Sequence, residues 1–184
     1  MEINDGTGSG NKAKVNSANE LEVRANTVSR AEWENHNNQR AYAMYFSQAA
    51  ANSGANECLG YIKNISDDDL VIDEISIHSV AADTIYVSKV TGTAAGGSAI
   101  VPTNLNIGSG KTASVTTMQH TAITGLTDAG RLLSFYLAAN GFFVRSPKAT
   151  ILIQKNSAIG IFTTANQANT LKVNIQFNYE DAHK

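Results

Sequence analysis

Apolar and polar residues alternate along most of the chain after residue 41. Between Leu171 and Tyr179 every second residue is apolar, over nine positions. Because successive side chains of a strand point to opposite faces, this run predicts a strand with one face in a core and one face in water. Residues 71–80 follow the same pattern, with a break at Asp73-Glu74 that predicts a bulge or a sheet edge.

Short runs of this kind recur along the chain. The predicted strands are residues 42–47, 57–65, 70–80, 84–90, 98–107, 112–118, 131–138, 149–155, 158–164 and 170–179. Turn-forming residues separate them at Ser66 to Asp69, Gly92 to Gly97, Gly108 to Gly110, Asn140-Gly141 and Asn156-Ser157. Roughly eight to ten short strands, with no helix needed to cross between them, predict a mostly β fold, an antiparallel jelly-roll-like β-sandwich.

Two stretches compete as helices. Residues 29–32 read Ser-Arg-Ala-Glu, which has the form of a capping box. They predict a short helix over roughly residues 30–40, and Arg40 near its end suits the helix dipole. Residues 126–137 also fit a helix, but an aromatic pair within them favours a sheet, so we predict a turn followed by a strand there.

The first 28 residues are polar, with apolar residues only at isolated positions. Such a segment cannot bury a core of its own and is either disordered or extended along another surface; the spaced Val and Leu residues favour the second. We therefore divide the chain into an extended N-terminal arm (1–28), a short helix or linker (29–41) and a β-sandwich domain (42–184). The candidate partner contacts are the apolar residues Ile3, Val15, Leu21, Val23, Val28 and Trp33.

Composition supports an assembly subunit. Charged residues make up 16% of the chain, below the usual quarter, and neutral polar residues fill the difference. Such a surface suits large protein contacts, in which an unpaired charge is costly. The net charge is −2 and the basic residues are scattered, so nucleic acid is not an expected partner.

Further features exclude a membrane protein and a disulfide scaffold. No apolar stretch approaches 18 residues, and the N-terminus lacks the basic start and hydrophobic region of a signal peptide. We expect a soluble protein made in a cytoplasm. The single cysteine, Cys58, lies in an apolar run and is expected to be a buried small hydrophobe.

Residues 108–112, Gly-Ser-Gly-Lys-Thr, end like a phosphate-binding loop. The full motif needs a glycine where this chain has Leu105, and a helix beginning at Lys111. The residues that follow, 112–117, are instead rich in β-branched types and favour a strand. We predict a hairpin turn and no nucleotide.

Metal and catalytic signatures are weak as well. Asp67, Asp68 and Asp69 suggest calcium, but consecutive acidic residues on a tight turn diverge, so we predict a solvated hairpin turn. The four histidines show no pair at metal-ligand spacing, and no Gly-x-Ser-x-Gly occurs. Asn64-Ile65-Ser66 matches a glycosylation sequon, which we attribute to chance. We predict no catalytic residue, no cofactor and no metal.

Several segments carry a family resemblance. In the arm they are Asp5 to Gly10, Lys12 to Val15 and Asn19 to Leu21; in the body they are Gly60 to Ser66, Asp69 to Ile72, Asn104 to Asn106 and Tyr179-Glu180. Together these segments resemble small virion proteins of tailed bacteriophages, which have such an arm and a β-sandwich body. The resemblance implies a particle component, a capsid decoration (cement) or head-surface protein, and carries over no catalytic residue.

We therefore expect a structural protein of the virion, in which the arm lies across neighbouring subunits. The expected partners are the major capsid protein or other virion subunits, and further copies of this chain, with a trimer as the guess. The alternative is a tail, baseplate or fibre component that binds host-surface glycans. A pilus-like adhesin and a small β-sandwich enzyme rank lower.

Overall fold

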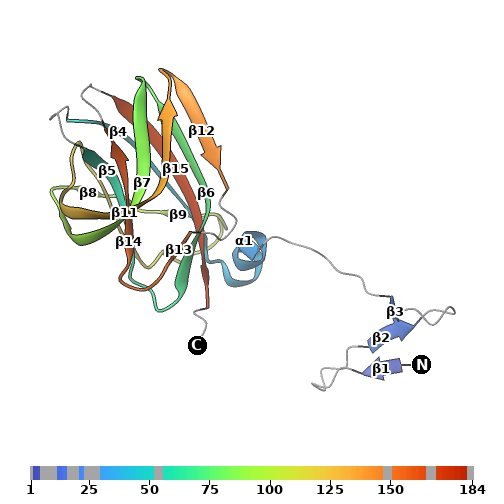
Figure 1. Cartoon of the computed structure of the whole chain (residues 1–184). Helices are drawn as coiled ribbons and strands as arrows, with labels where there is room; N and C mark the ends of the chain where they lie inside the picture. Colours follow the sequence, from blue (N-terminus) through green and yellow to red (C-terminus); the bar gives the residue numbers. More distant parts are fainter. Residues whose placement is uncertain are drawn as a thin grey trace.

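The chain folds mostly into antiparallel β-sheet, with very little helix (Figure 1). The computed structural model describes residues 2–4, 12–15, 21–22, 30–51, 56–146, 151–164 and 169–181, with side chains from residue 32 onward. A β-sandwich built of two sheets makes up the body, in agreement with the predicted fold class.

Two six-stranded sheets form the body, and we name each after a central strand. The β15 sheet has the order β12-β6-β15-β4-β9, with β13 also paired to β6. Its strands are β4 (Ala41–Ala49), β6 (Asp69–Ser79), β9 (Thr103–Asn104), β12 (Gly141–Arg145), β13 (Leu152–Ile153) and β15 (Thr170–Glu180). The β14 sheet has the order β11-β7-β14-β5-β10-β8. Its strands are β5 (Glu57–Asn64), β7 (Asp83–Ala95), β8 (Ser98–Ala99), β10 (Val115–Gln119), β11 (Thr124–Leu137) and β14 (Ala158–Thr163).

The long strands pair in reverse order along the chain. β4 pairs with β15, β5 with β14, β6 with β12 and β7 with β11, all antiparallel. β4 and β6 lie in the β15 sheet, whereas β5 and β7 lie in the β14 sheet. The chain therefore alternates between the two layers. Most connections therefore cross from one sheet to the other, and β11 and β12 become edge strands of different sheets.

Alternation along β15 produces the buried face that the sequence predicted. Val173, Ile175 and Phe177 are fully buried, whereas Lys172 between the buried residues is exposed. The register of β6 against β15 skips one residue, because Gln176 faces Glu74 and Phe177 faces Ile72. Asp73 is the extra residue, so the predicted break in this strand is a β-bulge.

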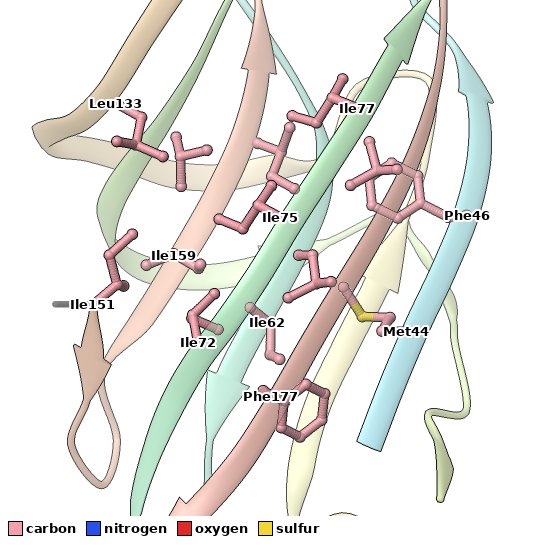
Figure 2. Close-up of a cluster of buried hydrophobic side chains, with 14 of the residues drawn as sticks. Met44, Phe46, Ile62, Ile72, Ile75, Ile77, Leu133, Ile151, Ile159 and Phe177 are labelled. Atoms are coloured by element: carbon pink, nitrogen blue, oxygen red, sulfur yellow. The ribbon is translucent and has the colours of Figure 1, made fainter. Parts of the chain in front are cut away.

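The main core lies between the two sheets. Figure 2 shows Ile72, Ile75 and Ile77 of β6 in one layer with side chains such as Ile62 and Ile159 of the other sheet. All five are at most 3% exposed. Burying a large aliphatic side chain contributes about 1.5–3 kcal/mol, so this cluster is the principal source of stability.

A second apolar cluster covers the opposite face of the β14 sheet. Ile159 and Ile161 of β14 enter the main core, so the alternating Ala158 and Phe162 face the other way. Phe162 stacks on Tyr86 with ring centroids 4.9 Å apart. A Cβ at Gly160 would lie 2.7 Å from the Phe162 ring, so this close packing requires glycine there.

The helix is shorter than predicted. α1 (Arg30–Trp33) continues into one π-helical turn, η1 (Glu34–Asn38), which ends where Gln39 takes a left-handed conformation with φ 53°. Arg40 therefore lies beyond the helix and not in its last turn. Ser29, the predicted cap, lies outside the described residues.

Three strand predictions need correction, and one strand was not predicted. Residues 98–107 form only the two-residue strands β8 and β9, and β10 begins three residues later than predicted. Of residues 149–155, only Leu152–Ile153 is strand, and 149–150 lie outside the described residues. β12 was missed because Phe142, Phe143 and Val144 are consecutively apolar and show no alternation. Residues 126–137 lie entirely within the strand β11, so the predicted strand there is confirmed and the turn predicted before it is wrong.

The N-terminal segment contains three short strands, β1 (Glu2–Asn4), β2 (Lys12–Val15) and β3 (Leu21–Glu22). They pair with one another in a third sheet, in which Ile3 faces Ala13 and Val15 faces Leu21. The predicted extended arm is thus locally paired at these positions. Contact of this segment with a neighbouring subunit stays a prediction.

Candidate interaction surface

The two edge strands β11 and β12 lie at one open side of the sandwich. Among the described strands, β11 hydrogen-bonds only to β7, and β12 only to β6. A turn joins them, in which Asn140 has φ 56° and the Gly141 N–H donates to the Ala138 carbonyl at 2.8 Å. Across this side, Phe135 and Phe143 stack with ring centroids 3.8 Å apart.

Two adjoining hollows run along this open side. One, of about 300 Å³, is lined by residues 132–135 with Phe143 and Arg145. The other, of about 200 Å³, is lined by Lys89, Leu132, residues 151–154 and residues 157–159. Leu132 lines both hollows, so they lie next to each other. We call this surface the edge slot and define it by Lys89, Leu132, Phe135, Phe143, Arg145 and Leu152.

The edge slot is lined by exposed apolar side chains and by basic ones. Leu132 and Leu152 are 46% and 44% exposed, although both are large apolar side chains. Lys89 and Arg145 are exposed and are the ionisable residues that line the two hollows. The slot therefore suits an apolar segment that carries negative charge.

More exposed apolar side chains flank the slot on the same two strands. Tyr136 of β11 is 67% exposed, and Phe142 and Val144 of β12 are 65% and 49% exposed. Unpaired edge strands with apolar side chains are aggregation-prone unless another chain or element covers them. This surface is therefore the strongest candidate for contact with another chain.

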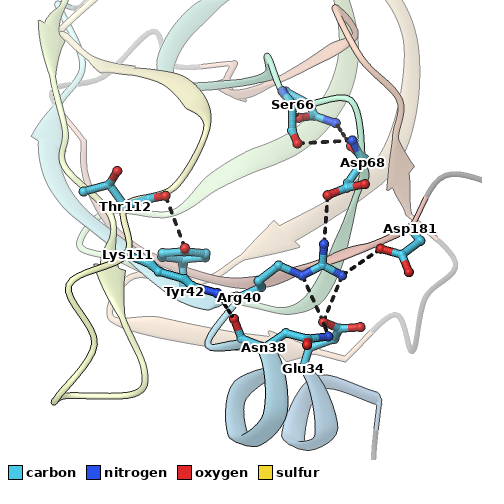
Figure 3. Close-up of polar contacts among 10 residues, drawn as sticks. Glu34, Asn38, Arg40, Tyr42, Ser66, Asp68, Lys111, Thr112 and Asp181 are labelled. Carbon is cyan, nitrogen blue, oxygen red and sulfur yellow. Dashed lines mark hydrogen bonds and ion pairs between the residues drawn. The ribbon is translucent and has the colours of Figure 1, made fainter.

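A charged cluster lies at the other end of β6 and β15. Figure 3 shows the Arg40 guanidinium between Glu34, Asp68 and Asp181, at distances of 3.1, 2.8 and 3.1 Å. Asn38 also donates to the fully buried Glu34 at 2.8 Å. This cluster holds the helical segment against β6 and β15. It contains three carboxylates and one guanidinium.

A cavity of about 300 Å³ adjoins this cluster and is lined in part by Tyr42, Lys111 and Tyr179. Lys111 donates to the Asn38 carbonyl at 2.8 Å, and Tyr42 donates to the Thr112 carbonyl at 3.2 Å. Burial raises the pKa of Tyr179, so its phenol stays neutral at physiological pH.

The Gly108–Thr112 segment is a loop. A turn is closed by the Ser109 N–H donating to the Asn106 carbonyl at 2.8 Å, and β10 starts only at Val115. No helix begins at Lys111, so the segment lacks the helix N-terminus that a phosphate loop uses. The predicted hairpin is wrong in one respect: β9 and β10 belong to different sheets, so the loop crosses between layers.

The three consecutive aspartates do not converge. Asp67 pairs with Lys155, Asp68 pairs with Arg40, and Asp69 begins β6. The predicted hairpin is again a crossing between sheets, because it joins β5 to β6. Among the described residues, no group of three or more His, Cys, Asp or Glu side chains is placed to hold a metal ion.

A buried polar cluster ties the β6–β7 and β14–β15 connections together. Asp83 accepts hydrogen bonds from Thr163, Thr164 and Asn169, and Asn169 also donates to Ser79 at 2.8 Å. The Ala81 N–H donates to the Asn169 side chain. Because the carboxylate is satisfied within the fold, its role here is structural.

The sequon asparagine is also structural. Asn64 is fully buried, and its amide group donates to the carbonyls of Asp68 and Ile153 at 2.7 and 2.8 Å. Its side-chain oxygen accepts from the Ser66 N–H. In the folded protein this amide is not accessible for glycosylation.

The predicted partner contacts fall in two groups. Ile3, Val15 and Leu21 lie together in the small N-terminal sheet, whereas Val23 and Val28 lie outside the described residues. Trp33 is 41% exposed on α1. The edge slot was not predicted from the sequence. Its one local signal was three consecutive apolar residues, Phe142 to Val144, directly after an Asn-Gly turn.

Two wider observations complete the description. Within the part of the chain that the structure describes, no helix combines the length and apolar content needed to span a bilayer. Comparisons with protein-family models, with curated proteins and with solved structures found no match to this chain.

Proposed function

We propose that this chain is a structural subunit of a phage particle, a capsid decoration (cement) protein that stabilises the head through its sandwich surface and its N-terminal arm. The observation that carries the proposal is the open side of the sandwich, where two edge strands expose Leu132, Tyr136, Phe142 and Val144. Such a surface is costly in water and is stabilised by burial against another chain. The sequence resemblance to virion proteins supplies the kind of assembly.

We infer further that the sandwich is a jelly roll. The support is the reverse-order pairing of β4 with β15, β5 with β14, β6 with β12, and β7 with β11. This is the order expected for a long hairpin rolled into two layers, which gives two Greek keys. Lectin domains and capsid proteins use the same architecture, so the fold is compatible with the proposal without selecting it.

The role proposed for the body is non-catalytic. Asp83 is satisfied by three donors, and Arg40 is held by three carboxylates. These are the arrangements of groups that stabilise a fold. The proposed role of the surface is to bind other copies of this chain and capsid subunits.

The proposal is tested on intact particles. The full chain, added to particles that lack it, is expected to bind at saturable sites on the head and to raise the temperature at which heads rupture. Deleting residues 2–28 is expected to leave the sandwich folded, with an unchanged near-ultraviolet circular dichroism spectrum, and to weaken particle binding at least about tenfold. Binding at full occupancy without the arm would rule out the arm's role, and localisation to the tail by cryo-electron microscopy would rule out the head assignment.

A second candidate function is glycan recognition by a tail or fibre component. It is favoured by exposed aromatic rings on the outer face of the β15 sheet, where Tyr45 is 59% exposed and Phe142 is 65% exposed. Between them the face carries polar residues such as Asn174, which is opposite Tyr45, and Ser76. Aromatic rings with neighbouring amides suit sugar faces. Specific signals on a glycan array, lost in a Tyr45→Ala variant, would favour this function.

Self-association is part of the main proposal, with a trimer as the proposed state. Because only 16% of the residues are charged, a large contact between subunits buries few charges, and its desolvation cost is low. Light scattering at micromolar concentration is expected to give a mass above that of one chain. If the protein is a monomer at that concentration but still binds particles, self-association occurs only on the particle.

A further inference from the structure

The edge slot combines three features that together specify an occupant. It exposes apolar side chains, it is bordered by strands with unused hydrogen-bonding edges, and its charged residues, Lys89 and Arg145, are both basic. An occupant that matches all three is an extended segment with alternating apolar and acidic residues.

The receiving part of β11 is well defined. β11 has register shifts at three places, the last between Arg131 and Leu133. From Leu133 to Leu137 the pairing with β7 is regular, so the opposite edge of this stretch presents regularly spaced backbone groups. A β-bulge disrupts the hydrogen bonding of an added strand, whereas a regular stretch can pair with one. The slot can therefore accept a strand of about five residues.

The chain itself contains a segment with the required pattern. Residues 20–23 read Glu-Leu-Glu-Val, in which two acidic residues alternate with two apolar ones. Leu21 and Glu22 already have strand conformation in β3, a strand of only two residues. Strands this short are marginal by themselves, so the segment gains stability by joining a larger sheet.

We propose that residues 20–23 of one copy dock as an added strand in the edge slot of a second copy. This inference rests on the proposed function, in which the arm links neighbouring subunits, and names the surface that receives the arm. Leu21 and Val23 are placed against Leu132 and Phe143. The two glutamates lie on the opposite face of the added strand, and their charge is attracted to Lys89 and Arg145 within about one Debye length. Each copy both donates and receives an arm, so the contact links subunits in a closed ring or along a lattice.

Cysteine cross-linking tests the contact directly. Two full-length variants, Val23→Cys and Leu132→Cys, are mixed and oxidised, and products are separated on a non-reducing gel. The native Cys58 is 2% exposed and does not compete. The control receiver is Val101→Cys, which is 82% exposed and so more accessible to random encounters than Leu132. A covalent heterodimer at least about tenfold more abundant with Leu132→Cys supports the proposal; equal yields overturn it.

A single chain carrying both Val23→Cys and Leu132→Cys separates docking between copies from docking within one copy. Disulfide-linked oligomers are the expected product. If the disulfide forms only within single chains, the arm occupies its own slot and the proposal is wrong.

Charge reversal tests the complementarity. Glu20→Arg with Glu22→Arg is expected to lower the cross-linking yield about tenfold, and so is Lys89→Glu with Arg145→Glu. Mixing the two reversed chains is expected to restore the yield to within about threefold of the original. Lys172→Glu, an exposed lysine of β15 outside the slot, is the matched control and leaves the yield unchanged. No recovery in the doubly reversed pair overturns the assigned contacts.

Particle binding by the same variants distinguishes the two proposals. Absence of a specific cross-link between the Val23→Cys and Leu132→Cys chains, with their binding to the head intact, contradicts this docking and leaves the proposed function standing. A specific cross-link in a chain that never binds particles contradicts the proposed function and leaves the docking intact.

Discussion

Phe135 of β11 and Phe143 of β12 stack with ring centroids 3.8 Å apart and planes within 13° of parallel. This contact joins the edge strands of two different sheets on the side where neither has a second strand partner among the described residues. It therefore closes the core at its open side and forms part of the slot that the arm is proposed to enter.

Replacing Phe143 with alanine is expected to lower the free energy of unfolding by about 2 kcal/mol, less than for a fully buried ring because the side chain is half-buried. Urea denaturation followed by circular dichroism measures the change. Phe142→Ala is the matched control on the same strand; that ring is 65% exposed, so a change within about 0.5 kcal/mol is expected. Equal losses in both variants would contradict a closing role for the Phe135–Phe143 pair.

Asp83→Ala is expected to destabilise the fold by about 3 kcal/mol, because it removes the carboxylate that accepts hydrogen bonds from the buried Thr163 and Asn169 and from the partly buried Thr164. The loss is expected as a lower Tm in thermal denaturation. Asp67→Ala removes a carboxylate whose side chain is 91% exposed and is expected to change stability by less than about 1 kcal/mol. A Tm for Asp83→Ala equal to that of the control would show that the cluster does not hold the connections.

The bulge residue Asp73 makes stability depend on pH. Burial, and secondarily the Glu180 carboxylate, raise the pKa of Asp73 to about 6, above the value of about 3.9 in an unfolded chain. The folded state therefore binds the proton more tightly, so this residue's contribution to stability is most favourable below about pH 4 and declines as pH rises through 6.

Asp73→Asn is expected to remove this penalty. At pH 7.5 the variant gains about 1 kcal/mol, less than the pKa difference alone implies because the side chain is partly exposed to solvent. At pH 4 the variant and the parent chain are expected to differ little. Urea titrations at the two pH values measure both. Glu74→Gln, on the adjacent residue, is the control, and an equal gain in it would point to a general charge effect.

Cys58 is expected to react slowly with thiol reagents in the native protein. It is 2% exposed, and burial raises the pKa of its thiol to about 12, so little thiolate forms at neutral pH. The reaction rate with a disulfide reagent at pH 8 is expected to fall at least about 100-fold below that of the protein in urea. An added cysteine in place of Val101, which is 82% exposed, is the positive control. Rapid labelling of native Cys58 would mean that the second apolar cluster opens readily.

The sequence was informative where a local pattern matches the period of a strand. The alternation from Leu171 to Tyr179 predicted β15 and its buried face, and the break at Asp73-Glu74 predicted the bulge, because both depend on residues adjacent in the chain. It was weaker at β12, where consecutive Phe and Val residues have no period. That strand takes its conformation from hydrogen bonds to β6, which is more than 60 residues away in the sequence.

The sequence by itself therefore determined the β class of the body, most of its strands and the apolar residues that fill its core. Only the tertiary structure decided that the turns at residues 66–69 and 108–110 cross between sheets, and that β11 and β12 lie together as unpaired edges. The physical reason is that side-chain alternation is set by the backbone of one strand. Partner choice and edge position are set by hydrogen bonds and packing between segments far apart in the chain.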